Sequence, residues 1–517
     1  MAFRKFKFVE DFIDPATGQP YENTGSPASK ETKNFGRFHG HQIAKIEYKE
    51  KKVKQKTVKV DEKTGKTEEG LEEETTIYEE RMGAKGGWIE KMANLSQGGK
   101  CWVEEGGFVL GDAFVDGDAI IKSGGEVGGH AKVSGEATVA GSAGVGESAY
   151  VYGKANINGG KRIAVGGMAR VSGTVDGNSK VYGNAKVGDG GVVKGEANVY
   201  GFAQVYGEVG GESAVYERAV VYGNIADECT VSGDAYIAKN GMVKGKSNVA
   251  GGSIVEGLVT GEATVVDSSH IGSEGTVRTA KVGGNSKIDG SVNQEAVVGD
   301  NANVRNGGLV GSECQMQGNS TLMEGGSLSS ESAIMENGRS AGGVDKSSID
   351  GNGSLGYGGS LGDSHVGDNA TLKKSGSKSS FTEGCLVAGT ADNTSAMGGG
   401  LVGSEGSLSK GGIEGGAVVF GSVSEGSVSG GAVVAKGGSL SSGLMKDNSR
   451  TAVSVSNGSL SDNGVAGEAF MASASGNGVA MFADQGVKDN EVCIEMPSGD
   501  GSDLPKRAAV LCKVEKE

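Results

Sequence analysis

A branched aliphatic residue falls at every sixth position from Val103 to Ile163 without exception. A helix repeats near 3.6 residues and a strand near 2, so neither element alone produces a six-residue repeat. Alanine stands two residues before most of these positions, and glycine stands four residues before many of them. We interpret the aliphatic residue as the core of a short strand, the alanine as its small neighbour and the glycine as a corner. The pattern predicts an all-β fold, a parallel β-solenoid.

The irregular steps predict three faces in each coil. After Ile163 one step of eight residues leads to Val171, and the register then continues to Val310, mostly in steps of six. Five steps hold only four residues, and all five fall on one face when the faces are counted in threes. We therefore expect triangular coils of 16–18 residues over 103–310. This geometry resembles the left-handed parallel β-helix, and the left-handed sense is implied by that resemblance.

The spacing changes after residue 310. From Leu408 to Val433 the aliphatic residues stand five apart, a period typical of four-sided pentapeptide-repeat solenoids, although a tighter three-sided coil also fits it. The tetrapeptide Gly-Ser-Leu-Ser recurs at 326–329, 406–409, 438–441 and 458–461. We expect 311–487 to be a Gly/Ser-rich solenoid continuation with a five-to-six-residue period.

The two ends differ from the body. Residues 1–41 hold three of the five prolines and read as an extended N-terminal arm. A basic strand over 43–60, a turn over 61–70 and an acidic strand over 71–80 predict a charged β-hairpin within a Trp-rich capping module at 42–102. Opposite charges across such a hairpin neutralise each other. Residues 488–517 lose the Gly/Ser bias and are expected to form a C-terminal cap or tail.

Both tryptophans lie where the hairpin meets the first coil. A first coil exposes an open core and an unpaired edge, which large apolar side chains can cover. We therefore expect Trp88, Ile89 and Trp102 to cap the solenoid.

The same junction carries a resemblance. The segments Gly86-Gly87-Trp88-Ile89-Glu90, Asn94-Leu95-Ser96 and Cys101-Trp102-Val103 lead straight into the hexads. In this the chain resembles a group of uncharacterised bacterial and phage hexapeptide-repeat proteins over about residues 35–310. The resemblance implies a β-helix and a phage or prophage association, but no established reaction. The hairpin insertion at 45–80 and the segment after 311 depart from that group.

Histidine is the residue on which an enzymatic reading depends. Hexapeptide-repeat acyltransferases resemble this chain in their hexads, and they act as trimers on acyl-CoA through a histidine base and a protruding loop or helix. The candidates here are His130, His270 and His365, and all three are expected to point to solvent. No motif places a carboxylate or serine beside them, and the two extra residues before Val171 are too few for a lid. No catalytic residue is therefore predicted.

The cysteine pattern and the net charge limit which ligands the protein is expected to bind. The six cysteines show no Cys-x-x-Cys spacing, so no metal site and no cofactor is predicted, and only Cys493 with Cys512 could form a disulfide. A net charge of −15 disfavours nucleic acid and anionic membranes. No apolar run at the N-terminus suggests a signal peptide or a membrane span. We expect synthesis in the cytoplasm, with the virion as a second location.

Tyrosines directly follow several core valines and so are expected to point outward. The candidate interface stripe consists of Tyr152, Tyr182, Tyr200, Tyr206 and Tyr222, of which Tyr152, Tyr206 and Tyr222 are expected to share one face. Such a stripe either stiffens the coils as a ladder or binds a protein or glycan.

Together these features predict a non-enzymatic structural or scaffold protein. Its expected form is a rigid β-helical rod, and its expected role is that of a phage-derived fibre, spacer or virion-associated component with protein partners or self-association. A trimeric acyltransferase and an adhesin that binds glycan or protein through the tyrosines remain alternatives.

Overall fold

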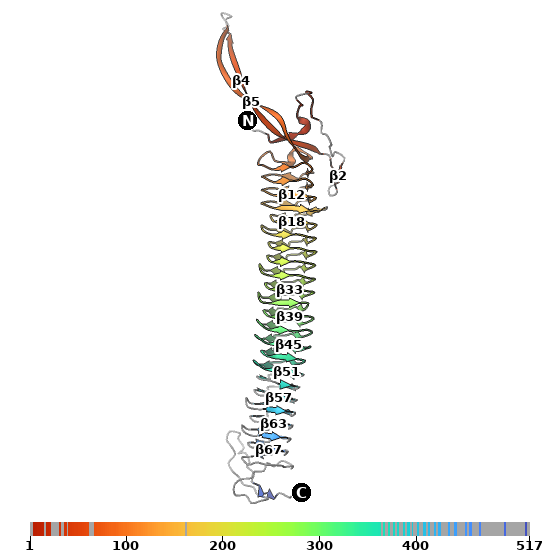
Figure 1. Ribbon diagram of the computed structural model, residues 1–517, viewed down its shortest axis with the longest axis vertical. Helices are drawn as coiled ribbons and strands as arrows, with labels where there is room; N and C mark the ends of the chain where they lie inside the picture. The colour runs from red at the N-terminus through yellow and green to blue at the C-terminus, as the bar shows by residue number, and fades with distance from the viewer. Residues whose placement is uncertain are drawn as a thin grey trace. The chain divides into compact units, whose positions relative to one another are not determined.

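The computed structural model describes residues 4–14, 17–21, 30–32, 36–38, 40–60, 67–160, 163–362 and 365–367, and a series of short strands from 371 onward (Figure 1). The helical elements in these ranges are two single 3-10 turns, η1 (Val9–Asp11) and η2 (Met92–Asn94). The prediction of an all-β fold is confirmed. The chain divides into two compact units, Met1–Lys239 and Asn240–Glu517, which are treated one at a time below.

In the first unit, short parallel strands stack on three faces, and each strand pairs with the third strand after it. The first face holds β7 (Phe108–Val109), β10 (Glu126–Val127), β13 (Gly144–Val145), β16 (Ile163–Val165), β19 (Lys180–Val181), β22 (Asn198–Val199), β25 (Ala214–Val215) and β28 (Thr230–Val231). The second face holds β8 (Phe114–Val115), β11 (Lys132–Val133), β14 (Tyr150–Val151), β17 (Arg170–Val171), β20 (Lys186–Val187), β23 (Gln204–Val205), β26 (Val220–Val221) and β29 (Tyr236–Ile237). The third face holds β6 (Trp102–Val103), β9 (Ile120–Ile121), β12 (Thr138–Gly141), β15 (Asn156–Gly159), β18 (Thr174–Gly177), β21 (Val192–Val193), β24 (Glu208–Val209) and β27 (Asn224–Ile225).

The second unit has the same three faces, which are numbered so that the four-residue step again leads from the second face to the third. Its first face holds β31 (Asn248–Val249), β34 (Thr264–Val265), β37 (Lys281–Val282), β40 (Val297–Val298), β43 (Gln315–Met316), β46 (Ala333–Ile334), β49 (Ser348–Ile349), β52 (His365–Val366), β55 (Ser380–Phe381), β58 (Ser395–Ala396) and β61 (Gly412–Ile413). Its second face holds β32 (Ile254–Val255), β35 (His270–Ile271), β38 (Lys287–Ile288), β41 (Asn303–Val304), β44 (Thr321–Leu322), β47 (Arg339–Ser340), β50 (Ser354–Leu355), β53 (Thr371–Leu372), β56 (Leu386–Val387), β59 (Leu401–Val402), β62 (Val418–Val419), β64 (Val433–Val434), β66 (Arg450–Thr451) and β68 (Val465–Ala466). Its third face holds β30 (Met242–Val243), β33 (Leu258–Thr260), β36 (Thr276–Arg278), β39 (Ser291–Asn293), β42 (Leu309–Val310), β45 (Ser327–Ser329), β48 (Gly343–Asp345), β51 (Ser360–Gly362), β54 (Gly376–Ser377), β57 (Thr390–Asp392), β60 (Ser407–Ser409), β63 (Ser422–Ser424), β65 (Ser439–Ser441) and β67 (Ser454–Ser456).

The predicted parallel β-solenoid with three faces is therefore confirmed. All five four-residue steps lie between the second and third faces, as expected; Val205 in β23 and Val209 in β24 are one example. The aliphatic residue of each strand is buried against its equivalents in the neighbouring coils, and Val199, Val205 and Val209 are each wholly inaccessible to solvent. Each unit thus has a narrow core of stacked valine, isoleucine and leucine side chains. The left-handed sense of the coil stays a prediction.

One position of the predicted register is wrong. The core residue of β16 is Val165 rather than Ile163, because Val145 pairs with Val165 and Val165 in turn pairs with Val181. The register shifts between Gly144 and Val145, as at a β-bulge. The long step therefore precedes Val165 instead of Val171. Ile163 and Val165 are both aliphatic and stand two residues apart, so either one fits a hexad count. The count alone selects Ile163, which comes first.

The pentad region also has three faces. Leu408 pairs with Val423 and Leu440 with Val455, each 15 residues further along, whereas four pentad faces would pair residues 20 apart. This result decides between the two geometries that fit the spacing. The first three Gly-Ser-Leu-Ser copies place Ser-Leu-Ser in β45, β60 and β65 of the third face. The copy at 458–461 lies outside the described residues.

The charged hairpin is confirmed, with longer strands than expected. Strand β4 (His41–Val60) pairs antiparallel with β5 (Thr67–Ile89), and lysines stand opposite glutamates at Lys49–Glu79, Lys54–Glu74, Lys56–Glu72 and Lys59–Glu68. The acidic strand begins before residue 71 and continues beyond residue 80, so the predicted turn over 61–70 was too long; residues 61–66 lie outside the described ones. The hairpin does not end before the solenoid, because β5 runs directly into the first coil.

The expected extended arm is in part a folded element. Strand β1 (Phe6–Phe8) pairs antiparallel with β4, and Phe6 is fully buried. Strands β2 (Lys30–Thr32) and β3 (Gly36–Phe38) pair with each other. At the other end, β69 (Glu491–Val492) pairs antiparallel with β70 (Cys512–Lys513), while Cys493, one half of the only cysteine pair that could form a disulfide, lies outside the described residues.

Candidate interaction surfaces

The junction motif forms the first coil of the solenoid. Its core residues are Ile89, Leu95 and Val103, one for each face, which pair with Val109, Val115 and Ile121 of the next coil. The core register thus begins at Ile89, two faces before Val103, where the regular hexads begin. The step from Leu95 to Val103 holds eight residues, which hides the first two core positions from a six-residue count.

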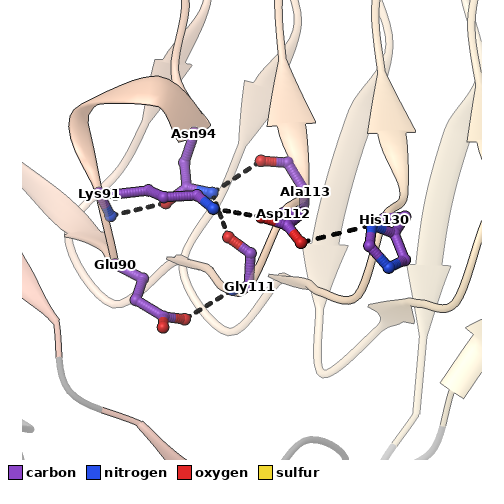
Figure 2. A network of polar contacts seen from close by, with 7 residues as sticks. All are labelled: Glu90, Lys91, Asn94, Gly111, Asp112, Ala113 and His130. Atoms are coloured by element: carbon purple, nitrogen blue, oxygen red, sulfur yellow. Dashed lines mark hydrogen bonds and ion pairs between the residues drawn. The ribbon is translucent and has the colours of Figure 1, made fainter.

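The side chain of Asn94 fastens this coil to the next one (Figure 2). Its amide oxygen accepts a hydrogen bond from the Lys91 backbone N–H at 2.7 Å, and its amide nitrogen donates to the carbonyls of Gly111 and Ala113 at 2.9 and 2.8 Å. Asn94 is fully buried, so these three bonds satisfy a polar group that would otherwise be costly to bury. Asn94 therefore has a structural role in the motif, a role that residue spacing alone did not reveal.

Charged groups surround the same corner (Figure 2). The Glu90 carboxylate accepts a hydrogen bond from the Gly111 N–H at 2.6 Å, and Lys91 forms an ion pair with Asp112. The hydrogen bond and the charge of Lys91 lower the pKa of Asp112, with a smaller contribution from His130. The Nδ1 atom of His130 lies 3.5 Å from the Asp112 carboxylate, and the histidine side chain is 72% exposed. His130 is therefore a solvent-facing partner of a structural ion pair.

Both tryptophans lie at the junction, as expected, and the hairpin backbone packs against one of them. The backbone at Gly86 and Gly87 lies directly against the side chains of Trp102 and Val103, so that added Cβ atoms would stand 2.5 and 2.6 Å from them. Ile43 of β4 is fully buried and close to Gly86. Small residues thus let the hairpin cross the first coil at close range.

The predicted capping residues divide into three roles. Ile89 belongs to the core of the first coil. Trp88 is nearly buried in a separate apolar cluster with Phe108 and Leu110. The Trp102 ring lies beneath Lys45, whose Nζ atom is 5.2 Å from the ring centroid. The N-terminal segment completes the cap, because the Lys5 ammonium group donates to the Cys101 carbonyl at 2.8 Å.

Four of the five predicted interface tyrosines form two ladders, one on the first face and one on the second. Tyr182 and Tyr200 follow core valines of the first face and stack with Tyr216, with ring centroids 5.0 and 4.9 Å apart and interplanar angles of 7°. Tyr206 and Tyr222 follow core valines of the second face and stack at 4.8 Å. The sequence indicated the positions of these four tyrosines. The predicted stripe did not include Tyr216, which belongs to the ladder of the first face.

Tyr152 shares the second face with Tyr206 and Tyr222, as predicted, but does not stack on them. Two coils intervene, in which Ser172 and Gly188 occupy the equivalent position. The Tyr152 ring instead stacks on Tyr150 of its own strand at 4.8 Å. The Tyr206 ring lies over Gly188, where an added Cβ atom would be 2.4 Å away.

Stacking determines what these tyrosines can bind. Both faces of a ring inside a ladder are covered by the neighbouring rings, so only its edge and hydroxyl remain accessible to a partner. Sugar rings bind aromatic side chains mainly through the ring face, so the ladder interior is a poor glycan site. Phe202 and Met168 are 61% and 63% exposed at the corner beside this ladder. These two side chains are more exposed than the laddered rings of Tyr182 and Tyr222, which are each 42% exposed.

The two remaining candidate histidines have partners that the sequence did not show. His270 lies 3.5 Å from the Glu256 carboxylate. His365 has two contacts, with the Ser348 hydroxyl 2.6 Å from its Nδ1 atom and the Asp350 carboxylate 3.3 Å from its Nε2 atom. No sequence motif placed a carboxylate or serine beside these histidines, and these neighbours come from adjacent coils.

The Ser348–His365–Asp350 set contains the groups of a nucleophilic serine site but lies on the outer side of two adjacent strands. Acyl transfer also requires N–H donors aimed at the developing oxyanion. One backbone donor of this set, the Asp350 N–H, is already bonded to the Val366 carbonyl at 2.9 Å. We therefore regard this set as a contact between coils.

The described ranges offer neither a metal-binding cluster nor a helix that could span a membrane. No group of three or more His, Cys, Asp or Glu side chains there could hold a metal ion. None of the helices in those ranges has the length and apolar character needed to cross a bilayer. Cys101, Cys229 and Cys314 are buried thiols in the described coils, and burial raises the pKa of Cys314.

Comparisons with known proteins give no further guide to function. No protein-family model matches the chain, and no curated protein sequence is significantly similar to it.

Proposed function

We propose that the protein is a non-enzymatic structural or scaffold protein whose stacked coils serve as a fibre, spacer or virion-associated component of phage origin. The observation that carries the proposal is the uniformity of each unit. Successive strands of a face pair in parallel, core residues stack directly on one another, and outward side chains continue the stacking as ladders. These side chains thus serve to join each coil to the next. The phage origin depends on the resemblance of the junction motif.

Solution size and shape test this proposal first. Light scattering combined with X-ray scattering on the purified chain should report an elongated particle, alone or in bundles. A compact trimer would contradict the proposal and favour the acyltransferase alternative. Acyl-CoA binding would then be measured for the wild type and for His130→Ala and His270→Ala, with loss of binding in either variant placing the site. A second test is cofractionation with virions, since absence from them would remove the virion role.

An adhesin role is the second candidate, and the exposure of Phe202 and Met168 favours it. Binding to such a surface should be lost in Phe202→Ala and Met168→Ala and retained in Tyr200→Phe, because the laddered Tyr200 offers little face to a partner. Immobilised glycans and host-cell envelopes are suitable probes. Equal binding by all three variants would exclude this corner as the adhesive surface.

A further inference from the structure

The charged hairpin has two long edges beyond its base. Strand β1 pairs with β4 at Ile43–Lys45, and the residues just before β1 reach Ile46 and Tyr48, while β7 joins β5 only at Trp88–Ile89. Between these contacts and the turn, the strands that the structure describes supply no third strand to either edge. Strand β4 has 20 residues and β5 has 23, so most of the ribbon is two-stranded.

A long two-stranded ribbon is an incomplete element. Two strands alone are marginally stable in water, and three or more are needed for independent stability. Each outer edge of such a ribbon offers a row of backbone donors and acceptors to a further strand. The ribbon is therefore suited to adding strands, and its side chains determine which strands it accepts.

Charge is segregated between the two strands. The lysines of β4 are Lys45, Lys49, Lys51, Lys52, Lys54, Lys56 and Lys59, against two glutamates, Glu47 and Glu50. The glutamates of β5 are Glu68, Glu69, Glu72, Glu73, Glu74, Glu79 and Glu80, against two basic residues, Arg81 and Lys85. The ribbon thus has one basic edge and one acidic edge.

We propose that hairpins of neighbouring copies of this chain pair edge to edge, with the basic β4 of one copy beside the acidic β5 of the next. Lysine on an edge strand normally prevents association because it repels an identical edge. Pairing of β4 with β4, or of β5 with β5, would place like charges together. Pairing of β4 with β5 places each lysine strand between two glutamate strands and extends the Lys–Glu register already present within the hairpin.

This pairing has a consequence for symmetry. The two surfaces in contact differ, so the contact is head-to-tail and generates either a closed ring or an open chain of copies. The inference adds a partner to the scaffold role and does not depend on it, since edge pairing could also occur if the solenoid served another purpose.

Molar mass as a function of salt tests the inference on the full chain. Exposed charge pairs are screened by added salt. We expect light scattering at low salt to give at least twice the monomer mass, and the monomer mass at high salt. A monomer at low salt over the accessible concentration range would overturn the proposal.

Charge-reversed hairpins make the test specific. In one variant Lys49, Lys54, Lys56 and Lys59 become glutamate, and in the reciprocal variant Glu68, Glu72, Glu74 and Glu79 become lysine. Each should be monomeric at low salt, because both edges then carry the same sign. Association at the wild-type level by either variant would contradict the proposal.

The combined variant guards against simple misfolding. With all eight changes the opposite charges within each hairpin return, and so does the complementarity between edges, so at least a twofold mass should reappear. If amide exchange shows that the hairpin of the combined variant is folded and the variant still does not associate, the proposal is overturned.

The matched control converts Lys122, Lys180, Lys239 and Lys281 of the solenoid to glutamate and should leave association unchanged. Scattering by the monomeric variants reports shape independently, so the scaffold role can fail while edge pairing holds.

Discussion

The two units share a core design and differ at one corner, where each first face turns toward the second. In the first unit the tyrosines before this corner stack at 4.9–5.0 Å. In the second unit the corner carries amides that donate from one coil to the next, at 3.2, 3.0 and 3.1 Å, along Asn285, Asn301, Asn319 and Asn337. Coils repeat at about 4.8 Å, a distance that suits both stacked rings and bonded amides. Aromatic or amide side chains that repeat at one corner position can therefore form a ladder along the coils.

The small residue inside the same corner also differs. In the first unit it is alanine at every coil from Ala131 to Ala235. In the second unit serine takes this position at several coils, among them those of Ser253, Ser269 and Ser286, whose hydroxyls donate to the carbonyl three residues earlier at 2.6–2.7 Å. A buried hydroxyl with a local acceptor is tolerated where an unpaired one would be costly. At these three coils the serine hydroxyls of the second unit are thus satisfied within the corner.

If the cores are equivalent, the largest effects should be equal in the two units. We expect Ile225→Ala in the first unit and Ile271→Ala in the second each to lower local stability by about 2–5 kcal/mol, because both side chains are fully buried. Native-state hydrogen exchange measures this for each region separately. The milder Ile225→Val and Ile271→Val serve as controls at about 0.5–1.5 kcal/mol. A loss confined to one unit would show that the cores are not equivalent.

The tyrosine ladder should contribute next. Tyr200 stacks on both Tyr182 and Tyr216, and aromatic pairs contribute about 0.5–1.5 kcal/mol each. Tyr200→Ala should therefore destabilise its coils by about 1–3 kcal/mol in hydrogen exchange. Tyr357 of the second unit is 72% exposed, and Tyr357→Ala is the control that should change little. Similar small effects at both positions would mean that the ladder adds no stability.

The same ladder predicts a dependence on alkaline pH. Partial burial, followed by the neighbouring Tyr182 and Tyr216, raises the pKa of Tyr200 above its ordinary value of 10.0. Above pH 10.0 the unfolded chain releases this proton while the folded chain keeps it, so folding loses stability as the pH rises through the raised value. Tyr200→Phe keeps a ring in the stack and should remove that part of the loss. Denaturant unfolding of the two proteins at pH 10 and above measures the loss, and an equal loss in both would contradict the assignment.

The solenoid could be predicted from the sequence because one face of every strand is buried. A valine in each strand repeats with the coil, so the hexad count found nearly every core position and the common face of the short steps. It failed at Ile163, where a bulge places Val165 in the core, and it missed Ile89 and Leu95, which precede an eight-residue step. A count at a fixed interval detects residues that repeat and overlooks coils whose corners are longer.

The surface was harder to predict because its contacts join different coils. The tyrosine positions were visible, but which rings stack depends on the register between coils 16 or 18 residues apart. The asparagines at 285, 301, 319 and 337 repeat at these same intervals, a signal that would have revealed their ladder once the coil lengths were known. The carboxylates beside His130 and His270 lie one coil earlier, beyond the reach of any local motif.

The asparagine ladder should have a smaller effect than the tyrosine ladder. Asn301 accepts from Asn285 and donates to Asn319, and both bonds are solvent-exposed. Asn301→Ala should cost about 1 kcal/mol, at the lower end of what two hydrogen bonds contribute. Asn248 is exposed on a strand of the same unit, has no side-chain bond in the described structure, and supplies the control Asn248→Ala. Hydrogen exchange in the second unit compares the two, and equal costs would show that the amide ladder is stabilising no more than an ordinary surface asparagine.

The smallest effects should distinguish two serines at the same corner position. The Ser286 hydroxyl donates to the Gly283 carbonyl at 2.6 Å, whereas the equally buried Ser320 hydroxyl has no hydrogen-bond partner in the described structure. Ser286→Ala should therefore cost about 0.5–1.5 kcal/mol, while Ser320→Ala should cost nothing or stabilise, because it removes a buried hydroxyl that gains little from folding. Hydrogen exchange of the flanking strands compares the variants. If Ser320→Ala proved the more damaging change, serine would be favoured at this corner for a reason other than its local hydrogen bond. The difference from the alanines of the first unit would then lie in packing.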